Sequence, residues 1–281
     1  MPELPEVETV RRTLQQALVG RKIVAVTRLA WERTIAAPTP DLFKQALQNR
    51  AIVDVDRRAK YVIILLDHHE ALVVHLRMTG RLMVADTDAA PDQHTHVVFQ
   101  LDTGQQLMFR DTRKFGRIWL LDREGLRLLD QKLGPEPLAE TLTVAAFGTA
   151  LRKRKGRLKP LLLDQRVLAG LGNIYVDEAL WIANLHPLQP ANELNDAQIE
   201  ALYHAIRQVL SEAITNRGTT FADYRDGWGF AGSNQNFLTV YDRKGEPCLR
   251  CGTLIERIVV GQRGTHLCPN CQRIGTINEQ G

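Results

Sequence analysis

The sequence predicts a multi-domain α+β protein with an N-terminal β-sandwich and flanking helices, a helical region, and a C-terminal β-hairpin beside four cysteines. Three observations lead to this fold class. The chain has 281 residues, enough for two domains with separate cores. Short β-rich runs dominate its first half, and helical periodicity dominates much of its second half. The four cysteines lie between residues 248 and 271, as two Cys-x-x-Cys pairs.

The first half begins with a predicted amphipathic helix over residues 5–19. Pro5 suits a first helical turn, and Gly20 is a typical stop. Apolar residues recur between them at helical spacing, at Val7, Val10, Leu14 and Leu18. The β-rich runs that follow are typical of a β-sandwich, and they cover residues 22–30, 51–57, 60–67, 71–77, 96–102, 106–110 and 117–122.

The second half begins at a boundary, Gly134-Pro135-Glu136-Pro137. Residues 218–236 are rich in Gly, Asp, Asn and Thr and have no clear period, which predicts a long loop of the kind that often carries function. The predicted helices cover residues 144–154, 159–166, 173–183 and 196–217. We therefore expect three parts, residues 1–133, 134–236 and 237–281.

The charge balance indicates a partner only weakly. Lys and Arg outnumber Asp and Glu by 36 to 32, and the sequence pI is about 8.9. No apolar run approaches the ~18 residues of a membrane span, so we expect no membrane partner. The acidic N-terminus lacks the basic and apolar pattern of a secretory signal. Because clustered cysteines favour metal in a reducing compartment, we expect a cytoplasmic location.

The cysteine spacing predicts one structural zinc ion. Cys248-x2-Cys251 and Cys268-x2-Cys271 can close a tetrahedron of four thiolates, which leaves no open position for catalysis. The alternatives are a redox pair or two disulfides. Between the pairs, two β-rich arms predict a hairpin with Arg263 at its tip, where a solvated turn cation is the plainer interpretation.

The N-terminus has one chemically suggestive residue, Pro2. Removal of Met1 would expose a secondary amine, and a free α-amine has a pKa of about 8. The neutral fraction could attack an electrophilic carbon, with Glu3 and Glu6 supplying proton transfer and stabilising positive charge. Ordinary helix capping explains the same residues without any chemistry.

A family resemblance decides between these interpretations. Met1-Pro2-Glu3-Leu4-Pro5-Glu6-Val7-Glu8-Thr9 resembles the N-terminal signature of the formamidopyrimidine-DNA glycosylases. Further motifs similar to this family follow in order, at residues 57–61, 75–80, 111–116, 170–180, 241–251 and 261–266. Residues 170–180 are similar to the family's helix-two-turn-helix element, so the resemblance implies a helical DNA-binding domain followed by a zinc finger.

The resemblance implies a bifunctional glycosylase and lyase of base excision repair that acts on oxidised purines such as 8-oxoguanine and formamidopyrimidines. Pro2 would attack the deoxyribose and leave a Schiff-base adduct. Glu3 would be the acid/base, with Glu6 as a supporting carboxylate. Lys60 is implied in β-elimination and Arg263 in δ-elimination, whereas without the family Lys60 would be a surface cation.

The resemblance also implies how DNA is held. A base must leave the stack before an enzyme can act on it, and Met78, Arg113 and Phe115 match the triad that fills the gap. By composition alone, Met78 and Phe115 would be core residues. Residues 218–236 are implied to close over the flipped base. DNA-binding is implied for Arg113 and for His94, Arg154, Lys155 and Asn173, of which His94 could equally be a surface loop histidine.

The expected partner is therefore double-stranded DNA with an oxidised base, bound by a monomer of bacterial type that works on the nucleoid. The nearest alternative is an endonuclease VIII-like relative, which prefers oxidised pyrimidines. Such relatives usually carry Gly where Leu4 stands and lack this form of the loop around Arg113 and Phe115. A second alternative is a zinc-ribbon DNA-binding protein without catalysis.

Overall fold

The computed structural model describes residues 1–86 and 88–274, which form two compact units. Unit 1 comprises Met1–Lys132 and Ala213–Gln235, and unit 2 comprises Leu133–Glu212 and the chain from Asn236 onward. The expected division into residues 1–133, 134–236 and 237–281 stays a prediction. Residues 275–281 of its last part lie outside the described residues.

Nine strands of unit 1 form one hydrogen-bonded sheet in the order β2-β9-β5-β4-β3-β1-β7-β8-β6. Only the β2–β9 pair is parallel among these described strands. The join between β3 and β1 has just two register pairs, so the sheet divides there into two halves. The strands are β1 (Lys22–Leu29), β2 (Ile35–Ala37), β3 (Arg50–Arg58), β4 (Tyr61–Leu66), β5 (Ala71–His75), β6 (Gly80–Asp86), β7 (Thr95–Leu101), β8 (Gln105–Asp111) and β9 (Arg117–Leu121).

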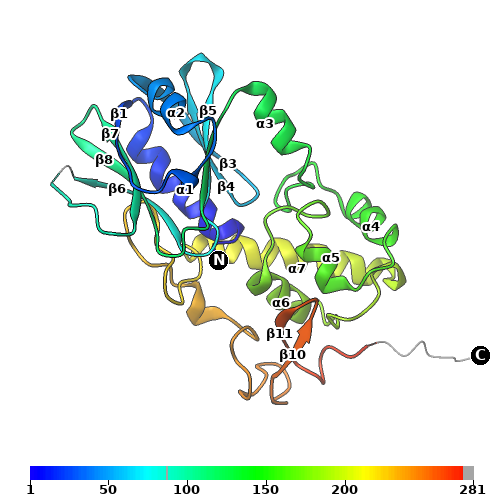
Figure 1. Ribbon diagram of the computed structural model, residues 1–281. Helices are drawn as coiled ribbons and strands as arrows, with labels where there is room; N and C mark the ends of the chain where they lie inside the picture. The colour runs from blue at the N-terminus through cyan, green and yellow to red at the C-terminus, as the bar shows by residue number, and fades with distance from the viewer. Residues whose placement is uncertain (87, 275–281) are drawn as a thin grey trace, which may run out of the picture. The chain divides into compact units, whose positions relative to one another are not determined.

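One core lies between the two halves. Phe99 and Phe109 of one half belong to the same buried cluster as Val62 and Ile64 of the other. Helix α1 (Leu4–Leu18) contacts β3 and β4 of one half and β6 of the other (Figure 1). It buries the stripe predicted from its periodicity, Val7, Val10, Leu14 and Leu18. The predicted β-sandwich with flanking helices is confirmed.

Several short elements of unit 1 were not predicted. They are the strands β2 and β6, the helices α2 (Pro40–Ala46) and α3 (Arg123–Asp130), and the 3₁₀ turn Glu32–Thr34. A second 3₁₀ turn, Asp67–His69, connects β4 to β5. Helix α3 covers part of the outer face of the sheet, where Leu126 and Leu129 pack against Ile63 and Val73. The outer face therefore has its own small apolar cluster.

The predicted helices of the second half are present as α4 to α7, and the predicted hairpin follows them. Their bounds are α4 (Val144–Arg152), α5 (Leu158–Leu163), α6 (Asn173–Ile182), α7 (Asp196–Thr215), β10 (Glu256–Val260) and β11 (Arg263–Leu267), with 3₁₀ turns at Ala191–Glu193 and Asn234–Phe237. The last residues of α7 belong to unit 1 and the rest to unit 2. Among the described residues, no helix combines the length and apolar character needed to span a membrane.

Candidate functional site

The N-terminus of α1 places two carboxylates within a turn of Pro2. Glu3 is the N-cap residue and Glu6 is the third helical residue, and the two form a reciprocal capping box. The Glu6 Oε2 atom accepts a hydrogen bond from the Glu3 backbone N–H at 2.7 Å. Pro2, Glu3 and Glu6 are all buried. Helix capping is thus observed, and it fixes both carboxylates beside the proposed nucleophile.

Glu6 also connects α1 to the predicted loop 218–236. Its Oε1 atom accepts from the Thr219 backbone N–H at 2.7 Å, and the Tyr224 hydroxyl donates to the Glu6 carbonyl at 3.3 Å. Burial and the neighbouring Glu6 carboxylate raise the pKa of Tyr224, so its hydroxyl stays protonated and able to donate. The carboxylate of Glu6 therefore supports the N-terminus with one oxygen and the loop with the other.

The loop itself is folded around one buried carboxylate. Asp226 Oδ1 accepts from the backbone N–H groups of Trp228 and Phe230, and its Oδ2 atom pairs with Arg217. Asp226 is buried, whereas three aromatic side chains are exposed, at Phe221, Trp228 and Phe230. The loop thus has a fixed backbone and presents apolar surface outward.

Lys60 lies in the turn between β3 and β4, next to Ala59, whose φ is 52°. The Arg57 side chain donates to the Ala59 carbonyl at 3.0 Å and is itself paired with Glu8. Lys60 is buried, so the plain interpretation of a surface cation is wrong. The role expected for Lys60 in β-elimination stays a prediction.

His75 faces the same turn and was not singled out from the sequence. It is 7% exposed, and its ring meets the Tyr61 ring edge to face at 4.7 Å between centroids. Burial, with help from the charges of Arg77 and Lys60, lowers the pKa of His75 to about 3. Its Nδ1 atom accepts from the Arg77 backbone N–H at 3.0 Å, as a neutral imidazole can.

The proposed inserting triad lies on two loops of unit 1 and is exposed. Met78 is 41% exposed and Phe115 is 48% exposed, so the alternative that they are core residues is wrong. The Arg113 guanidinium donates to Met78 Sδ at 3.1 Å and lies 4.8 Å from the centre of the Phe115 ring. The three side chains therefore already lie together.

His94 is half-buried, and its carbonyl accepts from the Asp111 N–H at 2.9 Å.

In unit 2, the start of α6 is joined to the hairpin. The Asn173 side-chain amide and the Lys159 ammonium both donate to the Gly264 carbonyl, at 2.9 Å and 3.1 Å. Asp177 accepts from Lys159 at 2.5 Å and from the His266 backbone N–H at 2.9 Å. These contacts hold β11 against α6 at Gly264 and at His266, the residues on either side of Thr265.

The basic run before α6 is not one solvated surface. Lys159 is fully buried, and it pairs there with Asp177 of α6. The local sequence could not predict this burial, because the partner carboxylate lies on another helix. Arg154 is half-buried and donates to the Ala150 carbonyl at the end of α4, at 2.7 Å. Lys155 is exposed. Of the two expected DNA contacts in this run, Lys155 is thus the freer.

The hairpin tip is a two-residue turn, Gly261-Gln262, with φ of 54° and 63°. Both residues have positive φ, as a type I′ turn requires. Arg263 begins β11 directly after the turn, pairs with Val260 in register, and is exposed. The predicted position of Arg263 at the tip is therefore what the structure has.

The finger base is anchored by Glu178, the residue after Asp177 on α6. Its Oε1 atom accepts from the N–H groups of Val240 and Tyr241, and its Oε2 atom accepts from the N–H and hydroxyl of Thr239. All four distances lie between 2.6 and 2.9 Å. A buried carboxylate with this many donors is stable only while the segment before the cysteines keeps its path.

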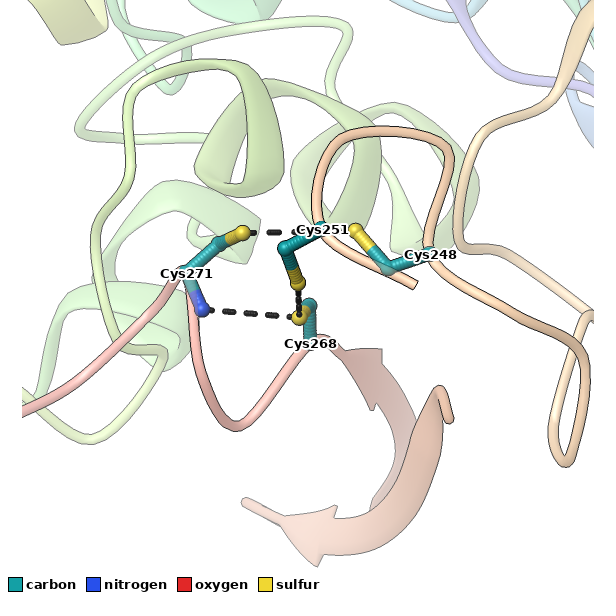
Figure 2. Close-up of side chains that lie close together, drawn as sticks. All are labelled: Cys248, Cys251, Cys268 and Cys271. Atoms are coloured by element: carbon teal, nitrogen blue, oxygen red, sulfur yellow. Dashed lines mark hydrogen bonds between the residues drawn. The ribbon is translucent and has the colours of Figure 1, made fainter. Parts of the chain in front are cut away.

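The four cysteines converge as a metal site (Figure 2). Their sulfurs all lie within 4.8 Å of one another, with 3.5 Å between Cys251 and Cys268 and 4.0 Å between Cys248 and Cys271. Four thiolates at about 2.3 Å from a tetrahedral Zn²⁺ would lie about 3.8 Å apart. A disulfide needs about 2.05 Å, so these spacings fit one structural zinc ion and exclude disulfides.

Three family models match consecutive segments of the chain. The matching models are described as the formamidopyrimidine-DNA glycosylase N-terminal domain over residues 1–118, its H2TH domain over residues 133–224, and a zinc finger found in FPG and IleRS over residues 245–274. A formamidopyrimidine-DNA glycosylase of Herpetosiphon aurantiacus is 56% identical over 97% of this chain and 100% of its own. The chain belongs to the formamidopyrimidine-DNA glycosylase family. It is thus a DNA glycosylase of base excision repair with a zinc finger.

Other formamidopyrimidine-DNA glycosylases agree. The one from Chloroflexus aurantiacus is 50% identical over 97% of this chain and 98% of its own. A crystal structure of a Lactococcus lactis FPG mutant with Fapy-dG-containing DNA has a TM-score of 0.91, at 39% identity over 97% of this chain and 100% of that one. MutM with carbocyclic 8-oxo-G-containing DNA has a TM-score of 0.90, at 40% identity and the same coverage.

The buried state of His75 predicts an acid-sensitive contribution to stability. Its pKa is about 3 when folded and 6.5 when unfolded, so unfolding takes up a proton between these pH values and stability falls as pH falls. Urea titrations between pH 7 and pH 4.5 measure the free energy of unfolding. This free energy should fall less steeply with falling pH in His75→Asn than in wild type, with slopes that differ by up to about 1.4 kcal/mol per pH unit. Parallel curves for the two proteins would contradict a neutral buried imidazole.

The Lys159–Asp177 pair predicts an asymmetric mutational response. Asp177→Ala leaves a buried ammonium without its partner, which costs about 3–5 kcal/mol, whereas Lys159→Met with Asp177→Leu removes both charges and costs less. Urea titrations of both variants against wild type measure the free energy of unfolding. Equal losses in the single and double variants would show that packing, not the unpaired charge, dominates.

Loss of the metal should unfold the finger without removing the sandwich. Zinc chelation, or Cys268→Ser, removes the ligand set that joins the two cysteine turns, so we expect residues 248–271 to lose their order. Metal analysis, together with hydrogen exchange of residues 248–271, is the measurement. Cys268→Ser with full zinc content and unchanged exchange would contradict the four-thiolate site.

Proposed function

We propose that this family member excises oxidised purines through a Schiff base formed by Pro2, and cleaves the strand by β,δ-elimination. The observation that carries the proposal is the buried arrangement of Pro2, Glu3 and Glu6 at the start of α1. This chain's relatives are formamidopyrimidine-DNA glycosylases, and similar proteins have been solved in complex with Fapy-dG and 8-oxo-G DNA, which supports the choice of substrate.

The first step needs a neutral secondary amine, which exists once Met1 is removed. The Pro2 nitrogen attacks C1′ of the damaged nucleotide, the glycosidic bond breaks, and the base leaves with a proton. The C1′–O4′ bond then opens, O4′ takes a proton from Glu3, and an iminium remains between Pro2 and C1′. Glu6 stabilises this cation, and its fixed hydrogen bonds keep it in place.

Two eliminations follow from the adduct. The iminium acidifies C2′, so loss of a C2′ proton expels the 3′-phosphate, and loss of a further proton from the conjugated sugar expels the 5′-phosphate. Lys60 serves the first elimination and Arg263 the second. Arg263 suits a phosphate because its guanidinium donates several hydrogen bonds from an exposed hairpin tip. Hydrolysis of the remaining adduct regenerates Pro2.

The duplex is held mainly by contacts that do not read sequence, with one contact to the base opposite the lesion. Met78, Arg113 and Phe115 enter the space that the extruded base leaves, and Arg113 pairs with the base opposite. His94, Arg154, Lys155 and Asn173 contact the phosphate backbone. The exposed aromatics of residues 218–236 close over the extruded base. The protein acts as a monomer in the cytoplasm, where reducing conditions keep the four thiolates available to zinc.

Borohydride trapping tests the nucleophile. Wild type, incubated with an 8-oxoguanine duplex and borohydride, should form a covalent complex that denaturing gels resolve. Pro2→Gly exposes a primary amine without the ring and should lose most of the trapped product while keeping DNA affinity. Because the amine must be free, an N-terminal tag should abolish trapping, and the same tag at the C-terminus is the matched control.

The outcomes separate the alternatives. Absence of a trapped complex with wild type would leave a DNA-binding protein without this chemistry. Stronger trapping on an oxidised pyrimidine than on 8-oxoguanine would favour endonuclease VIII-like specificity. Equal trapping by the N-terminally and C-terminally tagged proteins would show that another amine is the nucleophile.

A further inference from the structure

The two loops that carry the exposed triad meet at one buried carboxylate, Asp111. The first loop joins β5 to β6 and carries Met78, and the second joins β8 to β9 and carries Arg113 and Phe115. Asp111, the last residue of β8, is 1% exposed. The mechanism proposed above makes no use of it.

Each oxygen of the Asp111 carboxylate binds part of this loop pair. Oδ1 accepts from the Thr79 hydroxyl of the first loop at 2.5 Å and from the Arg113 backbone N–H of the second at 3.1 Å. Oδ2 accepts from the Gly116 backbone N–H at 2.7 Å. The Thr79 hydroxyl oxygen also accepts from the Arg113 N–H at 3.2 Å. One carboxylate and one hydroxyl thus join both loops.

The backbone of Asp111 is hydrogen-bonded to His96 of β7 and to His94, which precedes that strand. Its backbone N–H donates to the His94 carbonyl at 2.9 Å, and its carbonyl accepts from His96 Nε2 at 2.8 Å. A carbonyl can only accept, so His96 Nε2 is the donor in this contact. The carboxylate is therefore fixed to the sandwich rather than to a mobile segment.

Glycines at the loop ends allow this close packing. A Cβ on Gly116 would lie 2.4 Å from Phe109 Cζ and 3.1 Å from Asp111 Oδ2. A Cβ on Gly80 would lie 2.3 Å from the Leu76 carbonyl oxygen, which accepts from the Gly80 N–H. Both loops are consequently closed tightly at the points where they leave the sheet, and only their tips are exposed.

We propose that Asp111 is a positioning residue that locks the two loops together, so that Met78, Arg113 and Phe115 enter the duplex as one preassembled unit. The inference rests on the proposed function, since it concerns how the base is displaced. A wedge that is already ordered loses less conformational entropy on insertion, which lowers the barrier to extrusion. Asp111 contacts no DNA in this role, and it takes no part in the sugar chemistry.

The test compares a step that needs base extrusion with one that does not. Thr79→Val keeps the shape of the side chain but removes the hydroxyl that connects the loops, and Thr79→Ser keeps the hydroxyl as the matched control. Asp111→Asn replaces one acceptor oxygen with an amide donor, which weakens the contact of this side chain with the backbone N–H groups of Arg113 and Gly116. Each variant is assayed for single-turnover release of 8-oxoguanine and for borohydride trapping on a preformed abasic site.

We expect Thr79→Val and Asp111→Asn to slow base release by about tenfold, because the unlocked wedge has to be ordered during insertion. Trapping on the abasic duplex should stay within about twofold of wild type, because no base has to leave the stack. Thr79→Ser should resemble wild type. Fluorescence of 2-aminopurine beside the lesion, which reports unstacking, should rise more slowly in the two impaired variants.

Three results would overturn the inference. Unchanged base release in Thr79→Val would show that the loops need no connection. Equal losses on the lesion and abasic substrates, in variants that melt like wild type, would give Asp111 a general structural role. Wild type that releases no base and traps on neither substrate would remove the proposed function and this inference with it, whereas active wild type with unaffected variants removes only the inference.

Discussion

Asp177 and Glu178 carry two adjacent negative charges into the interior of unit 2. A buried carboxylate costs several kcal/mol unless donors satisfy it. Asp177 is satisfied by Lys159 and the His266 backbone, and Glu178 by the backbone of residues 239–241. These donors belong to α5, the hairpin and the segment before the cysteines. The position of the finger on α6 therefore follows from supplying donors to two neighbouring buried carboxylates, and zinc joins the two cysteine turns of the segment that these contacts hold.

The same constraint organises unit 1. Glu6, Asp111 and Asp226 are each buried, and each accepts backbone N–H groups from a loop that carries candidate site residues. Backbone donors leave the side chains of those loops free to face outward. The fixed carboxylate determines where each loop lies, and the exposed side chain determines what it can contact. Functional loops on a rigid scaffold need this separation between support and contact.

The local sequence pattern predicted features that depend on nearby residues. These are the buried apolar face of α1, the turn at the hairpin tip, and the metal site formed by the two cysteine pairs. The pattern failed where the deciding partner is distant in sequence. The short strands β2 and β6 depend on the neighbouring strands with which they pair. Lys159 lies in a basic run and is buried only because Asp177 faces it. Asp111 lies in the family-like motif at residues 111–116, but its contact with a hydroxyl 32 residues away could not be inferred from that motif.

The close approach of loop 217–219 to Glu6 connects the two parts of the proposed chemistry. A Cβ on Gly218 would lie 2.9 Å from Glu6 Oε1, and its φ of 80° also disfavours other residues. Only a glycine lets the Thr219 N–H reach that oxygen, while the other oxygen holds the Glu3 N–H. The segment expected to close over the base and the end of the chain expected to attack the sugar therefore share one carboxylate. A shift of the loop changes the hydrogen bonding of that carboxylate, and so the environment of the Pro2 amine.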